Sequence, residues 1–100
     1  MASALEILTH IDTYMKRFPD TKNQNWYVGV AAEDDIDRRL FKDHKVPKHG
    51  VWAYHPADSS AIARQVEKAY RDAGCDGGTV DWDDAATMVY AYLKAPYTEP

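Results

Sequence analysis

Three short runs rich in aromatic and β-branched residues most constrain the fold of this chain. They occupy residues 25–30 (NWYVGV), 51–55 (VWAYH) and 87–93 (TMVYAYL). Runs of this length and composition are typical of buried or half-buried β-strands. The segments between them are longer and more polar, so the sequence predicts three separate strands in a chain of only 100 residues.

Helical patterns fill the segments before and between these strands. Residues 3–18 begin with Ser3 and Glu6 in capping-box spacing, carry apolar residues at helical intervals and end at Pro19. A second helix follows the acidic residues 33–35 and stops before Pro47. A third, capped by Asp58 or Ser59 and closed at Gly74, has an apolar stripe formed by Ile62, Val66, Ala69, Tyr70 and Ala73.

The resulting order is α-β-α-β-α-β, with residues 75–86 as a loop. A second core would need about another hundred residues, so residues 1–100 are expected to form one domain. Within it we expect an N-terminal helix in 1–19, a core in 25–94 and a frayed tail in 95–100. The fold class predicted is α+β: a small three-stranded, mostly antiparallel sheet with helices packed on it.

Charge and cysteine content restrict the function. The formal net charge is −4, so any contact with nucleic acid must come from a local basic patch. The single Cys75 excludes an internal disulfide and a zinc site built from two cysteines of one chain, and it fits a reducing cytoplasm. We expect no membrane association, because the sequence has neither a signal-peptide pattern nor a run of about twenty apolar residues.

One basic segment stands out. Five of the twelve Lys and Arg residues fall within residues 38–48, namely Arg38, Arg39, Lys42, Lys45 and Lys48. Guanidinium and ammonium groups gathered in this way suit nucleic-acid phosphates. The alternative is an ordinary solvated helix face, because five acidic residues lie within positions 33–43 and weaken the local field.

A carboxylate and several tyrosines are further candidates. Glu67 borders the apolar stripe of the third helix, where a half-buried carboxylate needs a partner or a metal such as Mg²⁺. The alternative is an exposed glutamate that contacts Arg71 or Arg64 along the helix. Tyrosines in the strands (Tyr27, Tyr54, Tyr90 and Tyr92) can orient or deprotonate a water, or can simply form cross-strand pairs.

The order of these residues resembles the second half of the GIY-YIG nuclease domain over residues 25–73. Tyr27-Val28-Gly29 resembles the YIG element, Arg39-Leu40 and His44 resemble the following helix, and Glu67 resembles the glutamate of a later helix. The strand that carries the family's GIY tyrosine does not precede residue 25. The resemblance therefore implies a circular permutation in which residues 88–92 take that strand's place and supply Tyr90 or Tyr92.

The resemblance implies a metal-dependent phosphodiesterase or endonuclease, or a nucleic-acid-binding relative. Tyr27 would orient or deprotonate the attacking water, and Arg39 would neutralise charge on the phosphoryl oxygens. Glu67 would hold Mg²⁺ or Mn²⁺, and His44 and Tyr90 would assist in orientation or proton transfer. Nucleic acid would contact the other four cations of residues 38–48, namely Arg38, Lys42, Lys45 and Lys48.

Two other functions remain open at this point. The loop between Asp76 and Asp84 is rich in aspartate, and the pI is near 5.4. Both features favour a catalytically inactive module that binds another protein, for example a phage or mobile-element inhibitor of a host protein. A regulatory subunit that dimerises through an aromatic surface is the third reading. A one-metal nuclease site requires Tyr27, Arg39, Glu67 and a tyrosine of the last strand to converge within about 10 Å.

Overall fold

The computed structural model describes residues 3–77, 85–96 and 98. Its elements are α1 (Ala4–Met15), the 3₁₀ turn η1 (Asn23–Asn25), β1 (Trp26–Ala31), α2 (Ile36–Arg38), the π-helical η2 (Arg39–Asp43), β2 (Trp52–Pro56), α3 (Ser60–Asp72) and β3 (Met88–Leu93). The α+β class and the antiparallel three-stranded sheet are therefore confirmed.

The C-terminal strand lies in the middle of the sheet. The strand order is β1-β3-β2, and β3 pairs antiparallel with both neighbours, with Gly29 opposite Tyr90 on one side and Tyr54 opposite Tyr90 on the other. The short segment at Asp76 adds an isolated parallel bridge to Tyr27 along the outer edge of β1. Because β3 separates the two edge strands, each of them receives its neighbour from a distant part of the chain.

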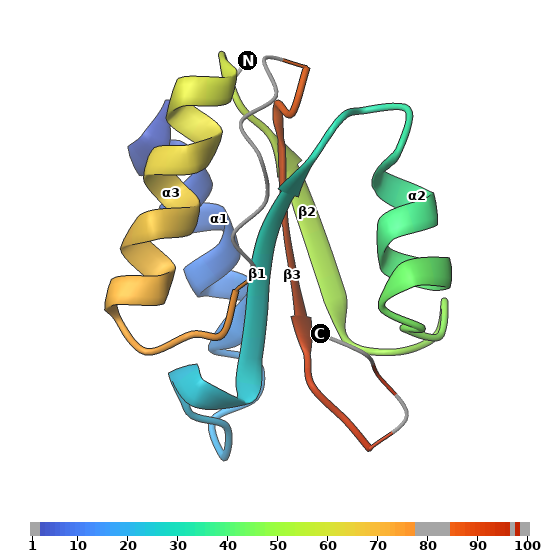
Figure 1. Cartoon of the computed structure of the whole chain (residues 1–100). Helices are drawn as coiled ribbons and strands as arrows, with labels where there is room; N and C mark the ends of the chain where they lie inside the picture. The colour runs from blue at the N-terminus through green and yellow to red at the C-terminus, as the bar shows by residue number, and fades with distance from the viewer. Residues whose placement is uncertain (1–2, 78–84, 97, 99–100) are drawn as a thin grey trace.

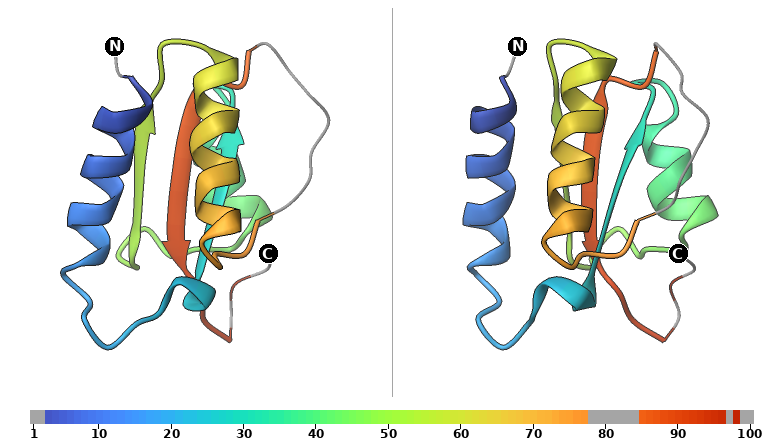
Figure 2. Two further views of the ribbon diagram at one scale, coloured as in Figure 1. Left: turned by 90° about the vertical axis from the view of Figure 1, so that its left-hand side faces the viewer. Right: turned by 60° about the vertical axis from the view of Figure 1, so that its left-hand side comes forward.

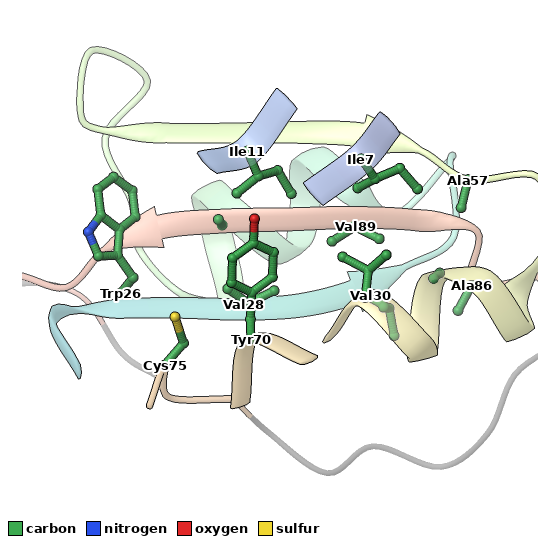
Figure 3. Packing of buried hydrophobic residues seen from close by; sticks show 13 residues of the cluster. Ile7, Ile11, Trp26, Val28, Val30, Ala57, Tyr70, Cys75, Ala86 and Val89 are labelled. Atoms are coloured by element: carbon green, nitrogen blue, oxygen red, sulfur yellow. The ribbon is translucent and has the colours of Figure 1, made fainter. Parts of the chain in front are cut away.

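Helices cover both faces of this sheet (Figure 1). On one face α1 lies over β2 and α3 lies over β1 and β3, and the two helices run side by side (Figure 2). Their contact is a buried cluster in which Ile7 and Ile11 of α1 meet Val28 and Val89 of the strands (Figure 3). On the other face, α2 and η2 pack Ile36 and Leu40 on a second cluster.

Two sequence signals explain where the long helices begin. The hydroxyl oxygens of Ser3 and Ser59 accept hydrogen bonds from the backbone N–H groups of Glu6 and Ile62, at 3.3 and 3.2 Å. Such caps satisfy donors that the first helical turn leaves unpaired. Ser59, rather than Asp58, is thus the cap of α3.

The element boundaries differ in detail from the expectations. α1 ends at Met15 instead of residue 18, because the chain tightens into turns there: Arg17 N–H bonds to Tyr14 O and Phe18 N–H to Met15 O. The expected second helix has one α-helical turn and then becomes π-helical. Most of the expected loop 75–86 and part of the expected tail 95–100 lie outside the described residues. None of the helices in the described part of the chain has the length and apolar character needed to cross a bilayer.

Candidate functional site

The α2-side face of the sheet carries an aromatic cluster. Strand register places Tyr27, Tyr92 and Trp52 in one row across the sheet, with Gly29, Tyr90 and Tyr54 in the next. Alternate residues of a strand share a face, so both rows lie beneath η2. Of these six residues, the tyrosines of β1 and β3 are buried and Tyr54 is exposed.

His44 sits at the centre of this cluster. Its Nε2 lies 2.7 Å from the Tyr90 hydroxyl and its Nδ1 lies 3.1 Å from the Tyr92 hydroxyl. A neutral imidazole has one N–H and one lone pair, so in that state one hydroxyl accepts a hydrogen bond from the ring and the other donates to it. The exposed fractions are 6% for His44, 1% for Tyr90 and 0% for Tyr92, so this network is shielded from solvent.

Tyr27 packs against this group, and Arg39 opens the turn that leads to His44. The Tyr27 ring centroid lies 4.7 Å from that of His44 and stacks on Tyr92 at 5.2 Å. Burial raises the pKa of Tyr90 far above the ordinary tyrosine value, and the neighbouring Tyr27 adds to this shift. The Arg39 guanidinium lowers the pKa of Tyr90 only in part. The structure therefore brings together three of the four predicted catalytic residues, Tyr27, His44 and Tyr90, while the fourth, Arg39, opens the turn that leads to His44.

The chemistry of this group favours packing and orientation over proton abstraction. A general base works best when its pKa lies near the working pH. Burial instead raises the pKa of both Tyr90 and Tyr92, which keeps the two hydroxyls protonated. With hydroxyls bonded to His44 and rings stacked on Tyr27, these side chains fasten η2 to the sheet.

Gly29 has a definite role in this arrangement. A Cβ atom added at this position would lie 2.6 Å from both Cζ and the hydroxyl oxygen of Tyr90. Real Cβ atoms essentially never approach other atoms so closely. The glycine of the Tyr27-Val28-Gly29 motif therefore gives the Tyr90 ring the space in which it reaches His44.

The π-helical turn explains how His44 reaches the sheet. Its backbone N–H bonds to Arg39 O at 2.9 Å, a five-residue spacing, and Val46 N–H then bonds to Leu40 O. Single π-turns are frequent at functional sites. Lys45 follows with φ of 58°, in the left-handed region, which turns the chain toward Pro47.

The basic segment is divided by charge along its length. Arg38 pairs with Asp35 at 3.2 Å, at the acidic N-terminal end of α2. Arg39 is half-buried, Lys42, Lys45 and Lys48 are exposed, and the Lys48 ammonium lies 5.8 Å from the centre of the Phe41 ring. Between positions 39 and 48 the sequence holds four cations (Arg39, Lys42, Lys45 and Lys48) and one acidic residue, Asp43.

Glu67 does not join the cluster. It belongs to α3, which covers the opposite face of the sheet from η2 (Figure 1), and it is only 3% exposed. Its Oε1 lies 2.5 Å from Arg71 Nε, although the angles do not meet those of a hydrogen bond. Burial raises the pKa of the Glu67 carboxyl, while the charges of Arg71 and Arg64 lower it to a smaller extent.

The surroundings of Glu67 do not favour a divalent-metal site, because its carboxylate is buried and paired with Arg71. Within residues 3–77, 85–96 and 98, no three His, Cys, Asp or Glu side chains gather where they could hold an ion. Glu67 instead forms the helix pair with Arg71 that was the alternative expectation, except that its carboxylate is buried rather than exposed. We therefore derive no hydrolytic step through Mg²⁺ or Mn²⁺.

Sequence reasoning missed one feature of this face, the aromatic pair of β2 at its edge, which consists of a half-buried Trp52 and an exposed Tyr54. Trp52 and Tyr54 stack with ring centroids 5.6 Å apart, and Tyr54 is 38% exposed. The signal was present, since alternation along residues 51–55 puts these two side chains on the same face.

Comparisons with known proteins do not test the resemblance to the GIY-YIG nucleases. No protein-family model, no curated protein and no solved structure matches this chain.

Proposed function

We propose that this chain is a nucleic-acid-binding relative of the GIY-YIG nucleases that binds without hydrolysing. One observation carries the proposal: Tyr27, His44 and Tyr90 meet on the sheet face covered by η2, the turn that opens at Arg39 in the basic segment.

Binding, rather than hydrolysis, fits the buried state of these groups. A catalytic tyrosine must reach a water and a phosphate, yet Tyr27 and Tyr90 are 7% and 1% exposed. The carboxylate that would hold the metal, Glu67, lies on the other side of the sheet and pairs with Arg71. The accessible groups of the site are the cations from Lys42 to Lys48, which suit phosphates.

The experiment measures binding and cleavage in parallel. Fluorescence anisotropy with labelled single-stranded and duplex oligonucleotides, over a range of salt, compares the native protein with Arg39→Ala and the double variant Lys42→Ala, Lys48→Ala. Lys68→Ala, on the far side of the sheet in α3, is the matched charge control. We expect salt-sensitive binding that the segment variants weaken and the control leaves unchanged.

Two results would contradict this proposal. Nicking of supercoiled plasmid in Mg²⁺ or Mn²⁺ but not in EDTA, abolished by Arg39→Ala and by Glu67→Gln, would establish a nuclease instead. Failure to bind any nucleic acid at low salt would exclude the binding function itself.

A protein-interaction module is the second candidate, and the outer edge of β2 favours it. Leu93 N–H bonds to Val51 O and Ala57 N–H bonds to Thr87 O at the two ends of the β2–β3 ladder. Since hydrogen-bonded pairs alternate along an antiparallel ladder, the backbone N–H groups of Trp52 and Tyr54 point away from β3. A partner strand could add to this edge.

A proline substitution tests this second candidate. Tyr54→Pro removes an outward N–H without removing a bond to β3, so the fold should survive. A partner that adds as a strand would be retained by the native protein and by Lys68→Ala but lost from Tyr54→Pro. Equal retention by all three would exclude strand addition at β2.

A further inference from the structure

The aromatic pair of β2, Trp52 and Tyr54, forms the edge of the η2 face: Trp52 packs against the buried cluster, and Tyr54 is exposed. The two rings are nearly parallel, with an interplanar angle of 18° and centroids 5.6 Å apart. Pro56, next on the same face, is also exposed. This side of β2 therefore leaves large apolar side chains in contact with solvent.

The two rings differ in how firmly they are held. Trp52 Nε1 donates a hydrogen bond to Lys48 O at 3.0 Å, and Phe41 packs edge-on against the indole at 5.1 Å. Trp52 is accordingly half-buried, whereas Tyr54 is 38% exposed. The result is a stack of two rings whose inner member is held in place and whose outer member, Tyr54, is exposed.

Cations lie at the Trp52 end of this stack. Lys48, whose carbonyl accepts the Trp52 hydrogen bond, places its ammonium 5.8 Å from the centre of the Phe41 ring, and Lys42 directly follows Phe41 on the exposed side of η2. Three of the five acidic residues in positions 33–43 precede α2, Asp37 lies within α2, and Asp43 follows Lys42 in η2. A ligand that combines negative charge with flat apolar rings complements this surface.

We propose that the β2 aromatic pair binds an unpaired base of a single-stranded nucleic acid, stacked on Tyr54, with the adjoining phosphates beside Lys42 and Lys48. This inference rests on the proposed function and specifies its ligand. Bases in a duplex are already stacked on one another, so a protein ring reaches a base face only in a single strand. Aromatic stacking joined to a cationic track is the usual means of binding single strands with little sequence preference.

The first test separates the ring from the hydroxyl of Tyr54. Anisotropy of a labelled oligothymidine and of a labelled duplex of equal length is measured with the native protein, Tyr54→Ala and Tyr54→Phe. We expect Tyr54→Ala to weaken single-strand binding by about 5- to 150-fold, the usual effect of removing one stacked ring, while Tyr54→Phe retains it. Tyr54 is an exposed side chain, so neither variant should unfold the domain, and thermal denaturation checks this.

The second test locates the bound base. Stacking beside Trp52 should quench indole fluorescence on titration with unlabelled oligothymidine, and Trp52→Phe should lose most of this quenching while it still binds the labelled strand. Lys48→Ala should lower the slope of log affinity against log salt by about one, and Lys68→Ala should not.

The outcomes distinguish this inference from the proposed function. Single-strand binding that Tyr54→Ala leaves unchanged, or affinity for the duplex equal to or above that for the strand, would overturn the stacking inference while nucleic-acid binding stands. Absence of binding to both oligonucleotides would overturn the two together and would direct attention to a protein ligand for the same surface.

Discussion

The close approach of Gly29 and Tyr90 makes Gly29→Ala the most informative single substitution. In an ordinary strand interior this change is stabilising, by about 0.5–1 kcal/mol, because glycine loses more backbone freedom on folding than alanine does. Here the new Cβ would lie 2.6 Å from the Tyr90 ring and hydroxyl, and Tyr90 is only 1% exposed. The substitution therefore forces a buried ring to move.

The cost of that movement has two parts. Overpacking of a core commonly costs about 1–3 kcal/mol. Displacing the Tyr90 hydroxyl also breaks its 2.7 Å contact with His44 Nε2, and a buried polar group that loses its partner costs about 1–3 kcal/mol. After subtraction of the backbone gain, Gly29→Ala should lower the free energy of unfolding by about 1–5 kcal/mol, which for a domain of this size lowers Tm by at least about 4 °C.

Urea and thermal denaturation followed by circular dichroism measure this effect, with Tyr90→Phe as the second arm of a double-mutant cycle. Both single variants lose the Tyr90–His44 hydrogen bond, and the double variant cannot lose it a second time. Tyr90→Phe also removes the hydroxyl oxygen, which is one of the two atoms nearest the Cβ of Gly29→Ala. The double variant should accordingly be less destabilised than the sum of the single variants. A rise in Tm for Gly29→Ala, or strict additivity in the cycle, would refute the reasoning.

Three further predictions concern the face of the sheet opposite η2, namely residues of α3 and the chain just beyond it. Burial raises the pKa of the Glu67 carboxyl, so the native protein loses stability as the pH rises through that pKa. Glu67→Gln lacks this titration, so the free energy of unfolding of the variant should rise relative to that of the native protein between pH 4.5 and pH 7. A difference in unfolding free energy that stays constant over this range would contradict the prediction. Burial raises the pKa of the Cys75 thiol to about 11, which leaves little thiolate at pH 8. Iodoacetamide at pH 8 should therefore alkylate the folded protein at least about 100-fold more slowly than the urea-unfolded chain, and equal rates would contradict the burial. Tyr70→Phe removes hydroxyl bonds to Asp12 Oδ1 at 2.7 Å and to Leu8 O at 3.2 Å, which should cost about 1–3 kcal/mol in urea unfolding; an unchanged midpoint would show that this α1–α3 link adds nothing.

Local patterns predicted the elements because short-range physics determines them. Ser3 and Ser59 cap helices through contacts three residues away, and the aromatic and β-branched runs form strands close to the expected bounds. The same alternation that places Tyr90 and Tyr92 on one face places Trp52 and Tyr54 together, and knowledge that β2 is an edge strand would have predicted the exposure of Tyr54.

Which side chains meet in the site was harder to predict, because this depends on the pairing register of the strands and on one irregular turn. The π-turn shifts every residue after Arg39 around the helix axis relative to α-helical spacing, and this shift carries His44 onto the sheet. Nothing in the local sequence marks such a turn. For Glu67, helical spacing predicted a place beside the buried stripe but did not decide between metal binding and the pair with Arg71, which is the contact observed.

The buried cluster and the exposed surface depend on each other physically. The hydroxyls of Tyr90 and Tyr92 hold His44, and so fix the end of η2 against β3. Immediately beyond, Lys48 O accepts the Trp52 hydrogen bond, so the chain that carries the cations is fastened at both ends. If the proposed ligand binds across Lys42, Lys48 and Tyr54, loosening the cluster should weaken binding even though no cluster residue touches the ligand. Gly29→Ala, assayed for oligothymidine affinity at a temperature where it remains folded, should therefore bind more weakly than the native protein, and unchanged affinity would show that the cluster serves stability alone.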